Sequence, residues 1–461
     1  MAIRGTRLDG HAFIDEAVAR GAAAVVAERL PDQNPGVPVV VVPDARKALA
    51  GFAAAWYGFP GNRIPLVGIT GTFGKTSVLA TLETVMRHAG IPIGVIGSEV
   101  IGARVLDRFR RSTPLTTPDA ISLQGTLAEI ADAGARAAAM EVTSQALAQE
   151  RVHGLAFSLG VFTNVRPLEH RESHGTFRAY VAAKRRFFDH IAPGAPVIYT
   201  AGERVIRELI RHRDVTPVGC GLGGSVPVRV AYRVSGLEHT EVRLCVRRAL
   251  PSVGLRKQLG PLELEFTLPL LGRTHAVNAC LAATAALILG APPGHVAKAM
   301  ATLPPVKRRT EVIHRGRFTV LDDAASHPES LNALFELICQ IPHRRLVIVA
   351  AIRGRRGVEL NQRYGEALAI WSERMPIDFL VATSSVDAVG ETDRVEAAER
   401  EAFVSAVSRA GIRNRVYDRL EKAIGAGLAR VRDGDLLVLL GAQGMHHGAE
   451  LLREAMRAGA G

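Results

Sequence analysis

A glycine-rich segment between an apolar run and an amphipathic stretch constrains the fold of this chain more than any other feature. Residues 68–77 read GITGTFGKTS, after the strand-like run 65–69 and at the start of the helix-like stretch 75–89. Glycines let successive backbone N–H groups approach phosphate oxygens, and the first turn of a helix adds partial positive charge. The segment predicts a phosphate-binding loop in which Lys75 reaches the terminal phosphates and Thr76 binds Mg²⁺, whereas the alternative is a turn without a ligand. The predicted ATP contacts in this loop are Gly71, Thr72, Gly74, Lys75, Thr76 and Ser77.

Around this loop the chain alternates short apolar runs with longer amphipathic stretches. Strand-like runs follow the loop at 137–141, 159–163 and 196–199. Strands that alternate with helices form βαβ units and a largely parallel sheet. Short alternating segments within 220–270 instead predict an antiparallel insertion.

Two interruptions divide the 461 residues into three blocks. The first is GFPGN at 58–62, and the second lies near Leu303-Pro304-Pro305. The blocks predict an α/β protein with three domains. These are an N-terminal domain at 1–60, a central P-loop ATPase domain with a parallel sheet at 61–306, and a C-terminal Rossmann-like α/β domain at 307–461; the family resemblance given below implies that the first is a truncated substrate domain.

Composition narrows the class of protein. The net charge of +12 comes from dispersed arginines, which indicates a solvated basic surface or attraction of phosphorylated and carboxylate substrates. The sequence contains no stripe of aromatic and basic residues, which disfavours nucleic-acid binding. The four cysteines form no C-x-x-C pair, which is typical of core thiols in a reducing cytosol. No apolar run suits a membrane span and the start lacks a signal core, so we expect a cytoplasmic protein with small-molecule partners. The oligomeric state stays open.

The loop also differs from the common G-x-x-x-x-G-K-[ST] motif, because its first glycine lies one position earlier. The longer form, G-x-T-G-T-x-G-K-[TS], resembles the Mur ligases and the related folylpolyglutamate synthetase. Further segments are similar, in the same order, to the MurE branch, which adds the third residue of the peptidoglycan stem peptide. They are TTPDA at 116–120, MEVTSQAL at 140–147, FTN at 162–164 followed by EH at 169–170, AAK at 182–184, and GR at 272–273 with NA at 278–279.

This resemblance implies an ATP-dependent ligase that joins an amine or amino acid to a carboxylate, such as a UDP-muramoyl peptide or a specialised analogue. The reaction would pass through an acyl-phosphate. The resemblance places the carboxylate substrate on Thr116, Thr117 and Pro118, and further ATP contacts on Asn278, Arg309 and Asp323.

The same resemblance implies that Mg²⁺ is held by Thr76, Glu141, His170 and Lys184, with Lys184 as a carbamate. With Lys75, the last three of these form the predicted catalytic set. A carboxylate at the end of a buried strand suits a hard cation. The ordinary alternatives are a helix cap for Glu141, a surface histidine for His170 and a solvated lysine for Lys184.

Several positions depart from the family pattern, mainly on the substrate side. The segment that helps to hold uridine in the family is not found ahead of residues 2–5, so we expect that a UDP-sugar is not bound or that the start is misplaced. Gln145 stands for a histidine, and Ala388 falls at the arginine of the D-N-P-R motif. We therefore expect altered substrates, and we expect diaminopimelate not to be the amine.

The C-terminal block carries further replacements. Ala324 and Ser326 stand for a tyrosine and a histidine, and Gln443 stands for a lysine. These replacements motivate one alternative to a ligase, a catalytically inactive nucleotide-binding homologue, and a P-loop kinase stays open as a second alternative.

Overall fold

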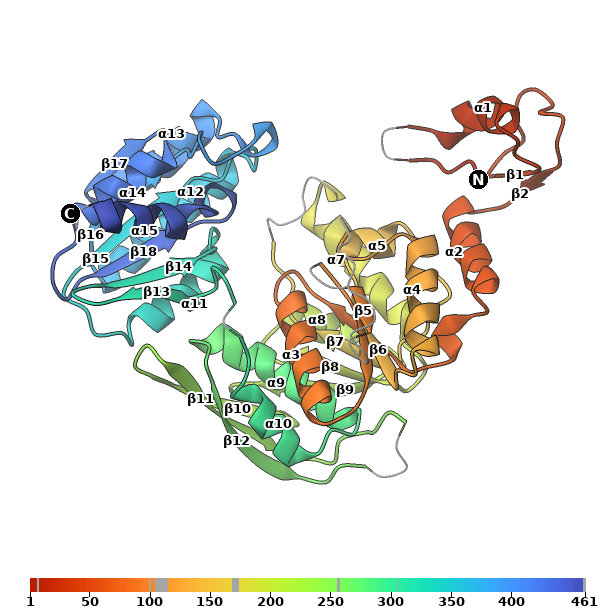
Figure 1. The fold of residues 1–461 in the computed structure, drawn as a ribbon, viewed down its shortest axis with the longest axis horizontal. Helices are drawn as coiled ribbons and strands as arrows, with labels where there is room; N and C mark the ends of the chain where they lie inside the picture. The colour runs from red at the N-terminus through yellow and green to blue at the C-terminus, as the bar shows by residue number, and fades with distance from the viewer. Residues whose placement is uncertain are drawn as a thin grey trace. The chain divides into compact units, whose positions relative to one another are not determined.

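The computed structural model describes residues 1–5, 8–98, 101–103, 115–167, 174–254, 258–304 and 306–458 (Figure 1). The chain divides into two compact units. Unit 1 comprises Met1–Val230, Leu244–Leu264 and Val277–Met300, and unit 2 comprises Ala231–Arg243, Glu265–Ala276 and Ala301–Gly461. The three predicted domain ranges are not tested by this division and stay a prediction.

A ten-stranded sheet carries the phosphate loop, and its strand order is β12-β11-β10-β9-β8-β7-β3-β6-β4-β5. The strands are β3 (Leu66–Thr70), β4 (Ile93–Ile96), β5 (Ile101–Ala103), β6 (Ala137–Glu141), β7 (Leu159–Phe162), β8 (Pro196–Thr200), β9 (Thr216–Gly221), β10 (Val228–Ser235), β11 (His239–Val246) and β12 (Leu262–Leu268). The helices are α3 (Lys75–His88), α4 (Ala120–Asp132), α5 (Ser144–Ala148), α7 (Phe177–Arg185), α8 (Arg204–Ile210), α9 (Arg273–Ile288) and α10 (Pro293–Met300).

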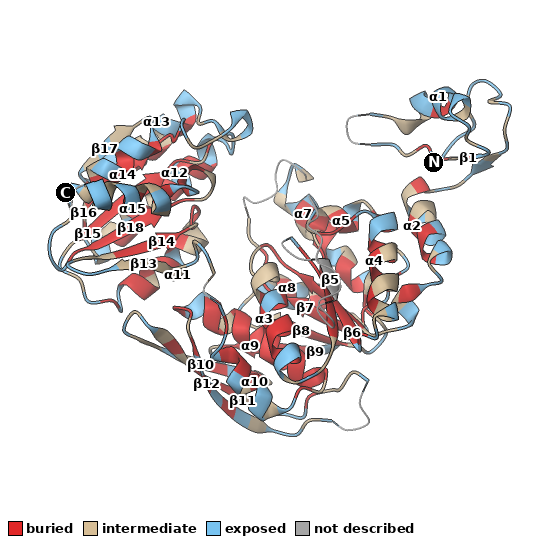
Figure 2. Ribbon diagram, viewed as in Figure 1, coloured by how far each residue is buried: buried red, intermediate tan, exposed pale blue. Residues whose placement is uncertain are grey.

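The centre of this sheet is parallel and buried. β3 pairs in parallel with β6 on one side and β7 on the other, and all its residues are buried. Continuous apolar strands of this kind are typical of a parallel sheet that helices cover on both faces. Figure 2 shows these strands in the colour of buried residues. The strands predicted from the apolar runs at 65–69, 137–141, 159–163 and 196–199 are confirmed.

The segment 220–270 only partly follows the predicted antiparallel insertion. β9 still pairs in parallel with both β8 and β10. β10 and β11 are neighbours joined by three residues, a connection too short for a parallel crossover. β10 and β11 therefore form a hairpin that extends the main sheet, and β12 pairs beside it. Their sequences alternate because only one face of these strands is covered, so the other face needs no apolar residues.

The N-terminal block is small. It contains α1 (Ile14–Ala19), β1 (Val25–Ala27), β2 (Val39–Val41) and α2 (Ala45–Trp56), and β1 and β2 form a parallel pair. Ala2, Ile14, Val25 and Ala27 form its core. Asp44 caps α2 by accepting from the N–H groups of residues 46 and 47.

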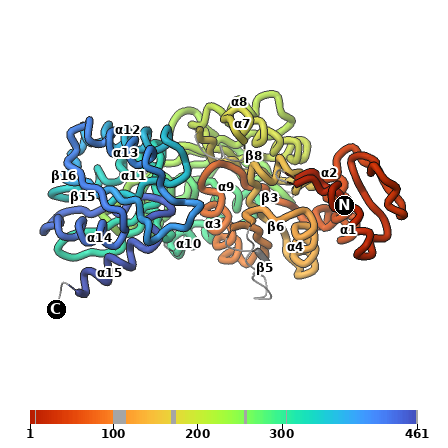
Figure 3. The backbone as a smooth tube through the Cα atoms, turned by 90° about the horizontal axis from the view of Figure 1, so that it is seen from above, coloured from red at the N-terminus to blue at the C-terminus, as the bar shows by residue number. Residues whose placement is uncertain are grey.

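The C-terminal block in unit 2 is a six-stranded sheet of order β13-β14-β18-β15-β16-β17. Only β13 is antiparallel to its neighbour among the pairings described. Figure 3 shows α11, α12 and α13 on one side of β15 and β16, and α14 and α15 on the other, which agrees with two separate cores. The strands are β13 (Glu311–Arg315), β14 (Thr319–Asp323), β15 (Leu346–Ala351), β16 (Ile377–Thr383), β17 (Asn414–Tyr417) and β18 (Leu436–Leu440). The helices are α11 (Pro328–Ile338), α12 (Val358–Arg374), α13 (Ala397–Arg409), α14 (Leu420–Leu428) and α15 (Gly448–Ala458).

None of the helices in the described ranges is long and apolar enough to cross a membrane.

Candidate active site

The phosphate loop connects the central strand β3 to α3. Gly71 has φ +146° and Gly74 has φ +85°, which are backbone conformations that favour glycine. A Cβ atom at Gly71 would lie 1.9 Å from Thr163 Oγ1, so this glycine also lets the loop pack against the neighbouring segment after β7. The positive φ angles and the close packing of the loop thus account for the glycines at positions 71 and 74.

Lys75 folds back onto this loop. Its Nζ donates to the carbonyl oxygens of Gly71 at 3.1 Å and Thr72 at 3.0 Å. Burial lowers the pKa of Lys75, and Glu141 partly opposes that shift. A half-buried ammonium whose direct partners are neutral carbonyls gains much from a nearby anion, so a phosphate group fits this position.

Glu141 ends β6 beside the loop and is 1% exposed. Both its carboxylate oxygens lie 3.0 Å from the hydroxyl of Thr76, and Oε1 also accepts from the N–H of Ser98 at 3.0 Å. A Cβ at Gly97 would lie 2.4 Å from this carboxylate, so the glycine makes room for it. Burial raises the pKa of Glu141. The helix cap of α5 is Thr143 rather than Glu141, which leaves this carboxylate and the Thr76 hydroxyl as oxygen ligands that fit Mg²⁺.

Lys184 lies on α7 and is 1% exposed. Its Nζ donates to Thr70 Oγ1 at 3.2 Å and stands 5.3 Å from the centre of the Tyr180 ring. Burial and the charge of Lys75 hold the pKa of Lys184 well below its ordinary value. This lysine is therefore not the solvated side chain of the ordinary alternative, and burial favours its neutral amine.

The third predicted metal ligand, His170, lies outside the described residues together with Glu169. Within the described ranges no group of three or more His, Cys, Asp or Glu side chains could hold a metal. His174 is described, and its Nε2 lies 3.0 Å from the hydroxyl of Ser144. Sequence reasoning missed His174, although the H-G-T at 174–176 directly ahead of α7 was an available signal.

The predicted substrate segment lies against Glu141. Thr117 is fully buried, and its hydroxyl donates to the carbonyl of Glu141 at 2.9 Å. Pro118 is buried as well. Thr116 is half-buried, and its Oγ1 accepts from the hydroxyl of Ser98 at 3.0 Å. Of the three predicted substrate contacts, only Thr116 keeps a side chain partly open to solvent.

Arg151 adjoins the same segment and was missed in the sequence. Its Nη1 donates to the carbonyl of Thr117 at 2.7 Å, and Gln149 accepts from its other nitrogens. Burial lowers the pKa of Arg151, and Asp119 opposes that shift. A half-buried guanidinium held on a backbone carbonyl offers a fixed cation beside Thr116, and no local motif marks it in the sequence.

Asn278 lies on α9 and is 7% exposed. A Cβ at Gly74 would lie 2.9 Å from its Oδ1 and 3.0 Å from its Nδ2. The side-chain amide therefore touches the phosphate loop, as its predicted role in binding ATP requires.

The C-terminal block positions Asp323 at the end of β14. Its two carboxylate oxygens accept from the N–H groups of Ala325 and Thr310, each at 2.7 Å. Burial raises the pKa of Asp323, and Arg309 opposes that shift. The side chain of Arg309 is exposed, so the guanidinium is accessible to a ligand.

Arg308 has a structural role that the sequence did not reveal. It stands where the family pattern has glycine, and its φ is +57°. Its guanidinium donates to the carbonyl oxygens of Gly441 and Ala442 and lies 3.4 Å from Asp322. The arginine thus connects the segment ahead of β13 to the segment that follows β18.

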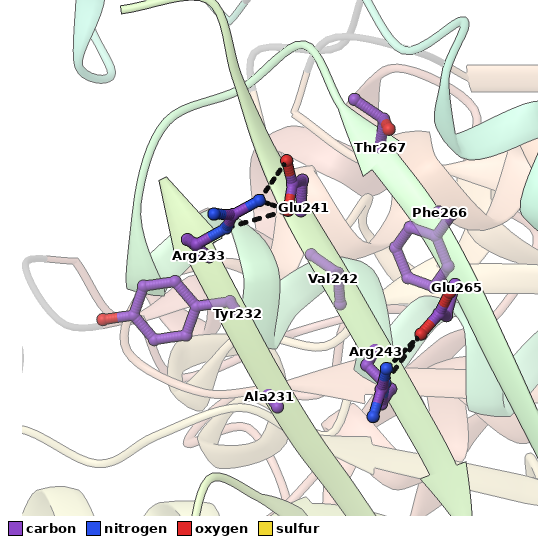
Figure 4. Close-up of a pocket in the computed structure, with 9 residues that line it drawn as sticks. All are labelled: Ala231, Tyr232, Arg233, Glu241, Val242, Arg243, Glu265, Phe266 and Thr267. Atoms are coloured by element: carbon purple, nitrogen blue, oxygen red, sulfur yellow. Dashed lines mark hydrogen bonds and ion pairs between the residues drawn. The ribbon is translucent and has the colours of Figure 1, made fainter. Parts of the chain in front are cut away.

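An open hollow of about 440 Å³ lies over β10, β11 and β12, and none of the residues described above lines it (Figure 4). Its arginines are paired across strands, Arg233 with Glu241 at 2.8 Å and Arg243 with Glu265 at 2.6 Å. Because these charges neutralise one another, the hollow lacks the unbalanced charge that marks the phosphate loop.

Comparison with known proteins agrees with this geometry. Residues 69–286 match the Mur ligase middle domain, residues 308–443 match the Mur ligase glutamate ligase domain, and residues 1–57 match the Mur ligase family catalytic domain. The UDP-N-acetylmuramoyl-L-alanyl-D-glutamate–2,6-diaminopimelate ligase of Geobacillus thermodenitrificans is 32% identical over 95% of this chain and 86% of its own. The UDP-N-acetylmuramyl-tripeptide synthetase of a Roseiflexus species is 33% identical over 96% of this chain and 86% of its own.

Solved structures show the same fold. A UDP-N-acetylmuramoyl-L-alanyl-D-glutamate–2,6-diaminopimelate ligase aligns with a TM-score of 0.65 at 20% identity, covering 98% of this chain and 90% of the other. MurF of Thermotoga maritima in complex with ADP aligns with a TM-score of 0.63 at 18% identity, covering 99% and 93%. The three matched domains follow the three-domain order of these ligases, and the kinase alternative falls away. With its phosphate loop, the two lysines beside it and this whole-chain similarity, the chain belongs to the Mur ligase family of ATP-dependent ligases that form carbon–nitrogen bonds.

Proposed function

We propose that this ligase activates the carboxylate of a UDP-muramoyl peptide, or of a close analogue, and joins it to an amine. The observation that carries the proposal is the cluster of the half-buried Lys75 and Thr76 with the buried Glu141 and Lys184 beside one phosphate loop. The two sequence relatives described above act on UDP-muramoyl peptides by name, which supports this class of carboxylate.

The chemistry has two steps. The substrate carboxylate attacks the γ-phosphorus of ATP, so an acyl-phosphate forms and ADP leaves. The amine then attacks the acyl carbon, an amide forms, and inorganic phosphate leaves with the loss of one proton from the amine. Lys75 stabilises the charge on the transferred phosphoryl group, and positioning by the loop supplies most of the remaining catalysis.

Mg²⁺ would be held by Thr76 and Glu141, and it would supply charge neutralisation at the phosphates. His170 is kept in this proposal as a further ligand. Lys184 is proposed to be carbamylated, because its amine is buried and its pKa is lowered. The neutral amine nitrogen attacks carbon dioxide, a carbamate forms, and one proton is released, which converts a buried neutral amine into an anion next to Lys75.

We infer that diaminopimelate is not the amine, although the Geobacillus relative carries that amino acid in its name. Ala388 occupies the position of the family arginine. The neighbouring carboxylate of Asp387 accepts from the N–H groups of Leu420 at 2.6 Å and Glu421 at 3.3 Å, so it serves to cap α14. A buried carboxylate that loses its arginine partner costs several kcal/mol, which disfavours a ligand with an additional carboxylate.

The test is a matrix of carboxylates and amines, scored by ADP release and by the mass of the product. The carboxylates include a UDP-linked muramoyl dipeptide, and the amines include diaminopimelate, lysine and simple amino acids. ADP release that requires both a carboxylate and an amine supports the proposal. ADP release with a hydroxyl acceptor alone would contradict it, and nucleotide binding without turnover on any pair would favour the inactive homologue. Efficient formation of the diaminopimelate tripeptide would overturn the inference about the amine.

A further inference from the structure

Tyr180 lies on α7 and is 1% exposed. Its hydroxyl lies 2.8 Å from the hydroxyl of Thr72, which belongs to the phosphate loop. This bond joins residues 108 positions apart, so it is a product of the fold and not of a local motif. The loop is therefore attached to a helix that the phosphate-binding motif does not include.

Thr72 is fixed from several directions. Its backbone N–H donates to the carbonyl of Asn164 at 2.9 Å. Its hydroxyl oxygen accepts from the N–H of Arg166 at 2.9 Å. Its own carbonyl accepts from Nζ of Lys75 at 3.0 Å. The hydroxyl of Tyr180 thus acts on the residue whose carbonyl holds the phosphate-binding lysine.

Tyr180 also stands next to the second buried lysine. Lys184 lies four residues further along α7, on the same face of the helix, and its Nζ is 5.3 Å from the ring centre of Tyr180. Lys184 in turn donates to Thr70, the last residue of β3. The two hydrogen bonds from this face of α7 therefore reach Thr70 and Thr72, on either side of Gly71.

We propose that Tyr180 is a positioning residue that holds the phosphate loop in register with α7, and so fixes Lys75 relative to Lys184. The hydroxyl acts through Thr72 and touches no reacting atom. Its loss removes one of the bonds that fix Thr72, so the carbonyl that orients Lys75 is held less firmly. This role rests on ATP binding by the loop and not on the identity of either substrate.

The ring and the hydroxyl of Tyr180 can be separated experimentally. The ring packs with His174 at 5.5 Å and Phe177 at 6.4 Å between centres, so Tyr180→Phe keeps this packing. Thr72 keeps the bond from Arg166 when the tyrosine hydroxyl is removed. The variant should therefore fold, with a small change in Tm.

The test is a double-mutant cycle on nucleotide affinity, with Tyr180→Phe, Thr72→Val and the double variant in the full chain. Calorimetry measures the dissociation constants of ADP and of a non-hydrolysable ATP analogue. We expect each single variant to bind about three to ten times more weakly, the scale of one hydrogen bond. The double variant should bind no more weakly than the worse single variant, since both remove the same bond. Thr72→Ser keeps the hydroxyl and should bind the nucleotide more tightly than Thr72→Val.

The matched control is Tyr199→Phe. Tyr199 packs against the same core but stands beside Gly219. The Tyr199→Phe substitution should leave nucleotide affinity unchanged. Additive losses in the cycle, or wild-type affinity in Tyr180→Phe, would overturn the proposal. Equal losses in both tyrosine variants, parallel to losses in Tm, would do the same, since they would indicate a purely structural role. If Tyr180→Phe does not fold, Thr72→Val against Thr72→Ser still decides whether the hydroxyl pair matters.

Discussion

The phosphate loop in unit 1 and the loops at the strand ends of the C-terminal sheet use charged side chains in opposite ways. Around the phosphate loop, the half-buried Lys75 and the buried Lys184 have neutral oxygen partners, and burial shifts both their pKa values. At the C-terminal sheet, carboxylates such as those of Asp323 and Glu399 are held by backbone N–H groups of the chain itself. We infer that Lys75 and Lys184 are placed to bind a ligand, whereas the charged groups at the C-terminal sheet hold its loops in their conformation.

Glu399 is the clearest example of the second kind. It is 2% exposed, and its carboxylate accepts from the N–H groups of Arg355, Arg356 and Gly357 at 3.0, 2.8 and 2.6 Å. In the same region Arg353 donates to the hydroxyl of Ser326 at 2.7 Å, at the position where the family pattern has histidine. The replaced residues of the C-terminal block are thus integrated into hydrogen-bond networks of their own.

The largest expected effect is at Lys184. Lys184→Ala should abolish amide formation, because it removes the group proposed to become a carbamate. A small carboxylate added to the medium should restore part of the activity. Carbon-13 NMR with labelled bicarbonate should show a carbamate signal in the wild type that this variant lacks. An unmodified Lys184 amine in active enzyme would contradict the proposed carbamate.

Lys75→Ala should follow closely. Loss of one preorganised donor to developing charge typically costs about 10²–10³ in rate. Because partial burial disfavours the charged form of this lysine, its removal should leave Tm unchanged or raised. The exposed Lys47→Ala serves as the control. Coupled ADP release measures the rate, and turnover within about threefold of the wild type would mean that this loop does not serve ATP.

Glu399→Ala should act on stability instead. It removes the charged acceptor of these backbone N–H groups, and a hydrogen bond to a charged group contributes about 1.5–3 kcal/mol. We expect a loss of about 3 kcal/mol in the free energy of unfolding, measured by urea titration, with some relief from water entry. Nucleotide affinity at the phosphate loop should stay unchanged. A selective loss of affinity with unaltered stability would reverse the contrast between the two regions.

The smallest effect concerns pH. Burial raises the pKa of Asp322 to about 6, above its value in the unfolded chain. A carboxyl with a raised folded pKa contributes stability below pH 4 that is lost as the pH rises to 6. Asp322→Asn removes this titration. Relative to the wild type, the variant should gain about 2 kcal/mol in unfolding free energy between pH 4 and pH 7. Parallel pH curves for the two proteins would show that Arg308 already compensates the charge.

Local patterns predicted some of these features and long-range contacts decided the rest. The phosphate loop, β3 and α3 follow from a contiguous motif, in which glycine conformation and helix start are encoded within ten residues. Glu141 and Lys184 required the family resemblance, because their burial depends on how β6 and α7 pack. The contacts of Tyr180 with Thr72 and of Arg308 with Gly441 join distant residues, so no periodicity or spacing announces them.

The position of β3 has a consequence for how this protein loses activity. The strand is paired along both edges, and its neighbours β6 and β7 are themselves interior strands of the sheet. Amide protons of such a strand exchange with solvent only through openings close to global unfolding. The loop at its end therefore cannot fray independently of the sheet. On slow heating, nucleotide binding and the cooperative structure of this region should disappear at one temperature, without an inactive but folded intermediate.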